Sequence, residues 1–381
     1  MSIQFAGGTI VNNTFTPTNK ATLQSNVMSN LVTAGWSQAT GHSGGGSQVV
    51  TISIASPGVV SLAAHGLLAN DSVVFSTTGA LPTGLTAGAQ YFVKTVLTSG
   101  TFTVSASSGG TVINTSGSQS GTQSMVGCVR MQSASTPWSV SMRLRLQDNG
   151  GTCITFSIEN STSSLAGGNS TTSGGQLNPG SGAITYRIIA NKYQAFIFQP
   201  SVTPGRGFVS FGTPYLPTFL QGVLTECSWM SSNAQSDTDT TARNSFRNTL
   251  NWVSVAGGNV QGIANTNLGE IDNSVNSQWG APCIFPPGAV LNSGINTLTG
   301  LIWTDQSALM SEPLIAWGTS MTNGSQSAAI GFQALLRGQL WDAVVICNIF
   351  TGDTTTTFDG HTWLNICDTS TNLGSLFVAT S

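Results

Sequence analysis

Hydrophobic and polar residues alternate along several segments of this chain, and the alternation predicts a mainly β protein. The clearest run extends from Trp138 to Leu146 and has apolar residues at every second position, namely Val140, Met142, Leu144 and Leu146. Because successive side chains of a strand point to opposite faces of a sheet, Arg143 and Arg145 share the other face. We expect that second face to be solvated or to form an interface.

The same kind of pattern predicts strands through the rest of the chain. In the middle third these are Thr152–Ile158, Ala183–Ala190 and Tyr193–Gln199, the last two joined by a hairpin at Asn191-Lys192. In the C-terminal third they are Gly300–Trp303, Pro313–Gly318, Ala328–Leu336, Leu340–Asn348, Thr362–Cys367 and Leu376–Thr380. The segment from Ser161 to Gly182 is rich in Gly, Ser and Asn, which predicts a long exposed loop or an interface strap.

Helical spacing is rare in this sequence. Near the N-terminus, Thr16-Pro17 predicts a helix start, with Thr16 as the N-cap, and Gly35 predicts its end. Between them, apolar residues recur every fourth position, at Leu23, Val27 and Leu31. A second, short helix is predicted within residues 240–253 from the spacing of Phe246, Leu250 and Val253.

Two tracts rich in Gly and Ser, Gly41–Ser47 and Ser116–Thr122, bracket a block of short β-rich runs separated by turn signals. The predicted strands of this block are Val49–Ile54, Val59–Leu62, Ser72–Ser76, Gln90–Leu97, Thr101–Ser105 and Thr111–Asn114. We therefore expect a small all-β domain at residues 48–122, inserted into a β-sandwich-like main domain. The main domain comprises 1–43, with the helix, and 124–381, divisible near 215–300. The two tracts are expected to act as flexible hinges.

The composition restricts the possible classes of function more than it restricts the possible folds. Only 7% of the 381 residues are charged, the net charge is −3, and there are 45 glycines. With 39% hydrophobic residues the chain is not disordered by composition, and without a basic stripe it is not expected to bind nucleic acid. No stretch approaches the roughly 20 apolar residues of a membrane span, so membrane insertion is not expected. Such an uncharged surface favours a building block that packs against copies of itself or fixed partners.

The titratable residues form no recognisable catalytic or metal-binding pattern. The histidines are His42, His65 and His361, and only His361 has a nearby acid, Asp359, which is expected to stabilise a turn. Asp237 and Asp239 lack the Gly and terminal Glu of a calcium loop. A glycosidase needs two placed carboxylates, and nothing marks such a pair. We therefore predict no catalytic, cofactor-binding or metal-binding residues, no cofactor, and a protein that is not an enzyme.

The cysteines and tryptophans have simpler interpretations. Six cysteines lie far apart in the sequence, at Cys128, Cys153, Cys227, Cys283, Cys347 and Cys367. Without close pairs they cannot form a structural zinc site, and we expect mostly free thiols. Four of the tryptophans lie at or within apolar strands, where core packing is expected: Trp138, Trp303, Trp317 and Trp341. Stacking of exposed tryptophans on sugar rings remains the alternative.

The bracketed block carries a resemblance to a known domain. Its residues include His65-Gly66-Leu67, Asp71-x-Val73-x-Phe75, the stretch Gly79 to Leu85 (GALPTGL), Tyr91-Phe92-Val93 and Phe102-x-Val104-Ser105. This pattern resembles a small all-β insertion domain that recurs in tail and virion proteins of tailed bacteriophages. Weaker likenesses to phage virion proteins lie at 31–36 (LVTAGW), 338–343 (GQLWDA) and 358–363 (FDGHTW).

The resemblance implies a structural component of a tailed-phage virion, in the tail or baseplate and in multiple symmetric copies. Its partners would be copies of itself and other virion proteins, and it would be assembled in the host cytoplasm and located in the virion. Two alternatives stay open. One is a capsid decoration or head-fibre protein. The other is a receptor-binding or polysaccharide-degrading tail protein that contacts a host-surface glycan.

Overall fold

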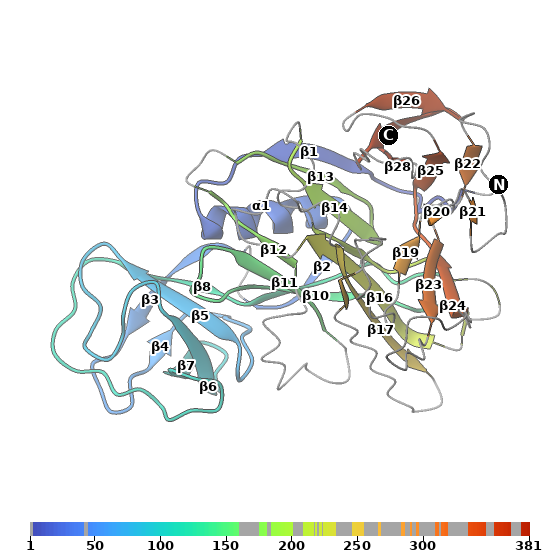
Figure 1. Cartoon of the computed structure of the whole chain (residues 1–381). Helices are drawn as coiled ribbons and strands as arrows, with labels where there is room; N and C mark the ends of the chain where they lie inside the picture. The colour runs from blue at the N-terminus through green and yellow to red at the C-terminus, as the bar shows by residue number, and fades with distance from the viewer. Residues whose placement is uncertain are drawn as a thin grey trace.

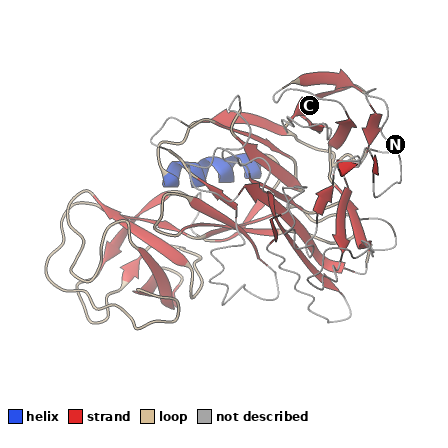
Figure 2. Ribbon diagram, viewed as in Figure 1, coloured by secondary structure: helices blue, strands red, loops and turns tan. Residues whose placement is uncertain are grey.

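The computed structural model is built mainly from β-strands (Figure 2). It describes residues 3–41, 45–159, 175–180, 184–200, 209–216, 218, 221–222, 224–233, 246–254, 266–267, 283–285, 290–291, 295–296, 309–311, 314–318, 334–347, 354–366 and 375–381. Within these ranges α1, Lys20–Thr33, is the only helix. All strand pairs are antiparallel, and six strands close a small barrel. The predicted fold class is therefore confirmed: a mainly β protein with a sandwich-like main domain, a small inserted β-domain and one N-terminal helix.

Two sheets form the sandwich. The seven-stranded sheet has the order β1 (Val11–Phe15), β13 (Tyr186–Ala190), β14 (Gln194–Phe198), β15 (Val209–Gly212), β16 (Leu224–Asn233), β17 (Phe246–Ser254), β18 (Thr266–Asn267). The five-stranded sheet has the order β12 (Gly175–Leu177), β11 (Ile154–Glu159), β10 (Arg143–Asp148), β9 (Val129–Gln132), β2 (Ser37–Thr40).

The C-terminal part adds three further sheets. A five-stranded sheet has the order β22 (Leu309–Ser311), β25 (Ala343–Cys347), β28 (Ser375–Ala379), β27 (His361–Asn365), β26 (Thr355–Phe358). A three-stranded sheet comprises β19 (Cys283–Phe285), β23 (Leu314–Gly318) and β24 (Ala334–Gln339), and a two-stranded one β20 (Val290–Leu291) and β21 (Ile295–Asn296). Much of the predicted dividing region, 215–300, lies outside the described residues.

The seven-stranded sheet is the middle layer of the main domain. One of its faces packs on the five-stranded sheet and α1, in a core that includes Ile188, Ile197 and Phe211. Its other face, with Phe196 and Trp229, packs on side chains of the C-terminal part. Every residue of β14 is buried as a result. The near-continuous apolar sequence of β14 follows from this burial on both faces.

Helix α1 lies against both sheets of the sandwich (Figure 1). Leu23, Val27 and Leu31 are fully buried on one face, as their spacing predicted. The predicted start at Thr16 is wrong. The N-cap is Asn19, whose side chain accepts a hydrogen bond from the Thr22 backbone N–H while Thr22 caps Asn19 in return. This reciprocal pair satisfies two free N–H groups of the first turn, which Thr16, three residues earlier, cannot reach.

The inserted block folds as a closed barrel with the strand order β3 (Ser47–Ile52), β4 (Val60–Ser61), β7 (Thr101–Ser105), β6 (Gln90–Thr98), β5 (Ser72–Thr77), β8 (Gln123–Gly127). Figure 1 shows it extending from one end of the sandwich. Strand β8, which pairs with both β3 and β5, lies beyond the expected end of the block at residue 122. The predicted strand at Thr111–Asn114 is reduced to one bridge, between Val112 and Ser105.

The second Gly/Ser tract does not form a hinge. Ser116 pairs with Thr83, Ser120 pairs with Ala80, and the Gln119 side chain donates to the Ile52 carbonyl at 2.6 Å. In the first tract, of which residues 42–44 lie outside the described residues, the Gly46 N–H donates to Gln24 Oε1 of α1 at 2.8 Å. Gly and Ser enable these close backbone approaches, so their abundance does not mark flexibility here.

Three further expectations differ from the structure. The predicted short helix at 240–253 overlaps strand β17, because Phe246 and Leu250 are four apart, a spacing that also places them on one face of a strand. The hairpin loop after β13 is Lys192-Tyr193 rather than Asn191-Lys192, because Asn191 hydrogen-bonds Gln194 across it. In the predicted strand at 138–146 the chain first turns at Ser139, where φ is 66°, and β10 begins at Arg143.

Candidate functional site

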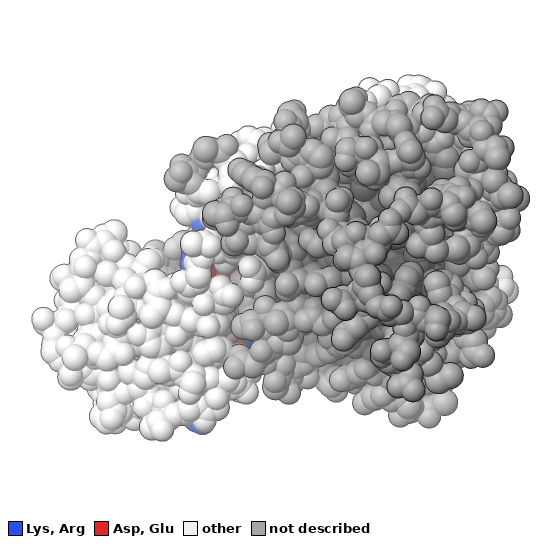
Figure 3. Space-filling view, in the orientation of Figure 1, with Lys and Arg blue, Asp and Glu red and all other residues white. Residues whose placement is uncertain are grey.

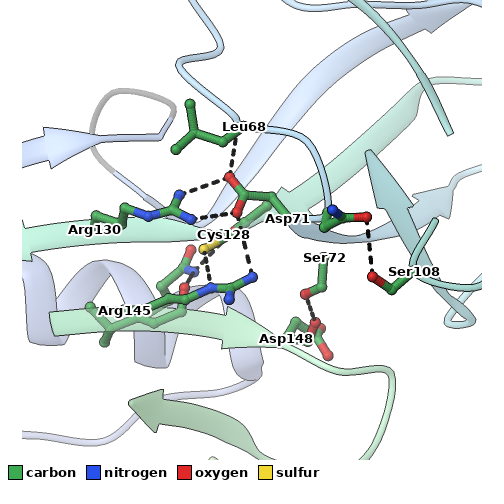
Figure 4. A network of polar contacts seen from close by, with 12 residues as sticks. Leu68, Asp71, Ser72, Ser108, Cys128, Arg130, Arg145 and Asp148 are labelled. Atoms are coloured by element: carbon green, nitrogen blue, oxygen red, sulfur yellow. Dashed lines mark hydrogen bonds and ion pairs between the residues drawn. The ribbon is translucent and has the colours of Figure 1, made fainter. Parts of the chain in front are cut away.

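The most developed polar site lies where the barrel meets the main domain (Figure 4). Asp71, directly before β5 of the barrel, is 1% exposed and faces Arg130 of β9, which is 2% exposed. The two side chains form a bidentate ion pair with nitrogen–oxygen distances of 2.8 and 2.6 Å. Asp71 Oδ2 also accepts the Leu68 N–H at 2.7 Å. A buried carboxylate with this many donors is fixed in position.

Arg145 of β10 completes the charged cluster. Its Nη2 lies 3.4 Å from Asp71 Oδ1, and its Nε donates to Cys128 Sγ at 3.1 Å. The side chain is 17% exposed, so this face of β10 is an interface with the barrel and is not solvated. Burial raises the pKa of the Cys128 thiol to about 11, and the nearby Asp71 carboxylate contributes to the rise. Cys128 is therefore a protonated, buried thiol and not a nucleophile.

A second set of contacts joins the barrel to the end of β10 and to α1. The Ser72 hydroxyl donates to the Asp148 carbonyl at 2.5 Å. The Asp148 carboxylate, 1% exposed as a residue, binds Lys20 Nζ of α1 at 2.7 Å. The Gln24 amide of α1 donates to the carbonyl of Gly127 at 2.9 Å. Together these contacts attach the barrel strands β5 and β8 to β10 and α1 of the main domain.

This junction accounts for much of the charge in the first part of the chain. In the first 160 residues, the charged side chains outside it are Lys94, Arg143 and Glu159. In the space-filling view, coloured atoms are visible where the barrel meets the main domain, whereas the rest of the barrel is almost uniformly white (Figure 3). The charges therefore mainly hold the two parts together, and the outer surface of the barrel is left almost without charge.

The histidines that the structure describes have structural roles. His65 is 1% exposed, with Nε2 3.1 Å from the Thr98 carbonyl oxygen, and its Nδ1 accepts the Leu67 N–H. His361 has Nδ1 2.7 Å from the Ser381 backbone oxygen and stacks on Phe5 with a ring separation of 4.7 Å. Asp359, expected to stabilise the adjacent turn, adopts a left-handed conformation there with φ of 52°.

Two of the predicted core tryptophans are seen in full, and they stack on each other. The rings of Trp138 and Trp341 are 5.9 Å apart and nearly parallel, and Tyr193 and Tyr215 pack around Trp341. Trp341 is 4% exposed and donates its indole N–H to the Thr213 carbonyl. This packing confirms a core role for Trp341, and Trp138 is half-buried beside it.

Other candidates lie outside the described residues: His42, Asp237, Asp239, Trp303 and most of the 161–182 segment, of which Gly175–Leu177 forms β12. Trp317 lies in β23, where only the backbone is described. Among the residues that the structure places, no three His, Cys, Asp or Glu side chains gather as a metal site. In the same part of the chain no helix is long and apolar enough to cross a membrane.

Sequence reasoning placed Arg145 on a solvated or interface face but did not connect it to its partner Asp71, or Asp71 to Arg130. Asp71 and Arg130 are 59 residues apart, and no local pattern connects them. One signal was present. Asp71 and Lys94 are the charged residues of the 48–122 block, and a charge in such a neutral segment indicates a specific partner.

Comparisons with known proteins give little further information. No family model matches the chain, and no curated protein matches it. Among solved structures, the phage phi92 endosialidase aligns over 90% of this chain and 70% of that protein, with 13% identity and a TM-score of 0.16. A score this low carries no argument about fold or activity.

Proposed function

We propose that this chain is a structural component of a tailed-phage virion, located in the tail or baseplate and present in multiple symmetric copies. The observation that carries the proposal is the inserted block. Its sequence resembles the insertion domain of phage tail and virion proteins, and its chain folds as a separate closed barrel. The proposal concerns a structural protein, not an enzyme.

The residues behind the resemblance are largely the residues that build the barrel. Its hydrophobic core contains matching positions from each quoted motif, including Leu67, Val73, Phe75, Leu85 and Phe102. His65 packs edge-on against Phe102, with ring centroids 4.9 Å apart. The resemblance therefore lies in side chains that specify the fold of the barrel. A likeness of this kind is informative about the fold of a domain.

The surface and the junction are consistent with fixed contacts inside a particle. The barrel is held to the sandwich by a buried ion pair, which favours one orientation before assembly. Its exposed surface carries little charge, which suits packing against neighbouring subunits through apolar and hydrogen-bonding groups. The Cys128 thiol at the junction is buried and protonated, so it is not an activated nucleophile.

Immunogold labelling of virions tests this proposal directly. Antibodies raised against the purified chain are expected to place gold on the tail or baseplate of intact particles. Gold on the head would overturn the tail assignment and favour a decoration or head-fibre protein. Absence of gold from particles, with the antigen found only in infected-cell lysate, would overturn a virion role altogether.

A further inference from the structure

Among the described residues, strand β26 forms one edge of the C-terminal sheet and pairs only with β27. The pairing runs from Thr355↔Leu364 to Phe358↔His361, without a register shift. The Asn365 N–H donates to the Thr354 carbonyl at 2.8 Å. Because hydrogen-bonded pairs alternate along an antiparallel ladder, the backbone N–H and C=O groups of Thr355 and Thr357 point away from β27.

The outer edge of β26 is accessible. The side chains of Thr355 and Thr357 are exposed, whereas Thr356 and Phe358 are half-buried. No hydrogen bond within the described part of the chain reaches the outward backbone groups of Thr355 and Thr357. Figure 1 shows β26 at the outer margin of the molecule, with no labelled strand beyond it.

Proteins usually protect such an edge with charged side chains, proline or a bulge, and β26 has none of these. Its sequence is Thr-Thr-Thr-Phe, in which the three threonines are β-branched and favour extended backbone. Three of the other edge strands differ, whereas the edge strands β12, β18, β19 and β22 also contain no charged residue or proline. Arg187 reaches across to Asn12 of β1 at 2.9 Å, β2 carries a register shift, and β24 contains Arg337.

We infer that β26 is the site at which two copies of this chain pair edge to edge, so that their C-terminal sheets become continuous. A two-fold axis places β26 of one copy antiparallel to β26 of the other, so that Thr355 of each copy lies opposite Thr357 of the second. Each such pair exchanges two backbone hydrogen bonds.

The uncharged sequence is what favours a second copy as the occupant. Across a two-fold axis a strand meets its own sequence, so any charged residue within the pairing would face a like charge nearby. The four residues of β26 avoid that repulsion. This inference rests on the proposed function, which requires copies of the chain to contact one another, and it assigns one of those contacts.

Sedimentation velocity of the full chain tests the pairing. The wild type is expected to sediment as a dimer or a larger even-numbered assembly. Thr357→Lys, which places a charge on the open edge, is expected to shift it to half that size. Thr51→Lys is the matched control, because Thr51 is an exposed strand residue on the barrel and the same charge there is expected to leave the assembly intact.

A monomeric wild type, or a Thr357→Lys variant that stays assembled, would overturn the inference. Either result leaves the virion assignment standing if gold still labels particles, so the two failures can be told apart. Should Thr357→Lys fail to fold, hydrogen exchange of the wild type decides the question. The amides of Thr355 and Thr357 are expected to become protected as protein concentration rises, and unchanged fast exchange at all concentrations would contradict the pairing.

Discussion

At the scale of single residues, the most consequential side chain is Asp71. It forms ion pairs with two arginines, Arg130 and Arg145, and both Asp71 and Arg130 are almost completely buried. In Asp71→Asn the arginine charges stay buried without their carboxylate, and breaking a buried pair in this way costs about 3–5 kcal/mol. We expect a loss of that size in the free energy of unfolding, measured by urea denaturation.

Asp359→Asn provides the control for this substitution. It makes the same chemical change at an exposed position whose left-handed backbone asparagine also tolerates. Its expected effect is within about 0.5 kcal/mol. If Asp71→Asn were as mild as Asp359→Asn, the junction would not depend on the ion pair.

Asp342 gives the chain an unusual pH dependence. The residue is 2% exposed, and its carboxylate accepts the Ala6 N–H at 2.9 Å and the Asn191 side-chain amide at 2.6 Å. Burial nevertheless raises the pKa of Asp342 above its ordinary value, outweighing these bonds. The folded state thus binds a proton more tightly than the unfolded chain, so this group makes folding more favourable as pH falls through the folded pKa.

Comparison with Asp342→Asn isolates that contribution, because residue 342 of the variant cannot titrate. The contributions of all other carboxyl groups to the free energy of unfolding cancel in the difference between the two proteins. The free energy of unfolding of the wild type minus that of the variant is expected to increase between pH 7 and pH 4. The increase is about 1.4 kcal/mol for each unit by which the pKa is raised. Urea titrations of both proteins at the two pH values measure it, and a difference that shrinks on acidification would show that the pKa is lowered instead.

At the scale of elements, local patterns predicted what local physics determines. The spacing of Leu23, Val27 and Leu31 gave the helix, and the alternation at Leu144 and Leu146 gave a buried strand face. Patterns fail where one spacing fits two structures, as in β17, or where a tract rich in Gly predicts a hinge and the chain is instead paired. The ion pair between Asp71 and Arg130 depends on tertiary packing alone, so no local pattern could predict it.

Two glycines of the barrel, outside the two Gly/Ser tracts, show what glycine contributes to its packing. Gly84 has φ of +107°, and a Cβ there would lie 2.4 Å from the backbone oxygen of Asn114. Gly88 has φ of +77°, but a Cβ at that position would have no atom within 4 Å. Both alanine variants incur backbone strain, but only Gly84→Ala also forces two segments apart. We expect Gly84→Ala to lower the free energy of unfolding by about 1–3 kcal/mol more than Gly88→Ala.

Thermal or urea unfolding of the two glycine variants measures that difference. Equal losses in the free energy of unfolding would mean that the 79–85 stretch and the segment near Asn114 can move apart without destabilising the protein. The barrel would then be closed by its strands alone, and the GALPTGL sequence would need another explanation.

At the scale of the whole molecule, charge is used in an unusual way. Several of the few ionisable side chains are concentrated at the internal junction, where Asp71, Arg130 and Arg145 meet. The open edge of β26 and most of the barrel surface are uncharged. Ion pairs thereby fix the internal junction, and in the proposed assembly the contacts between copies would use backbone hydrogen bonds and neutral side chains.

This division predicts how assembly responds to salt. Raising ionic strength from about 0.1 M to about 1 M shortens the Debye length from roughly 10 Å to roughly 3 Å and screens exposed charges. Contacts between uncharged groups are hardly weakened by this screening, and a buried ion pair is screened far less than an exposed one. We expect assemblies of the purified chain to keep their sedimentation coefficient across that range. Dissociation at high salt would mean that charged side chains hold the copies together, and that the neutral edge of β26 is not their main contact.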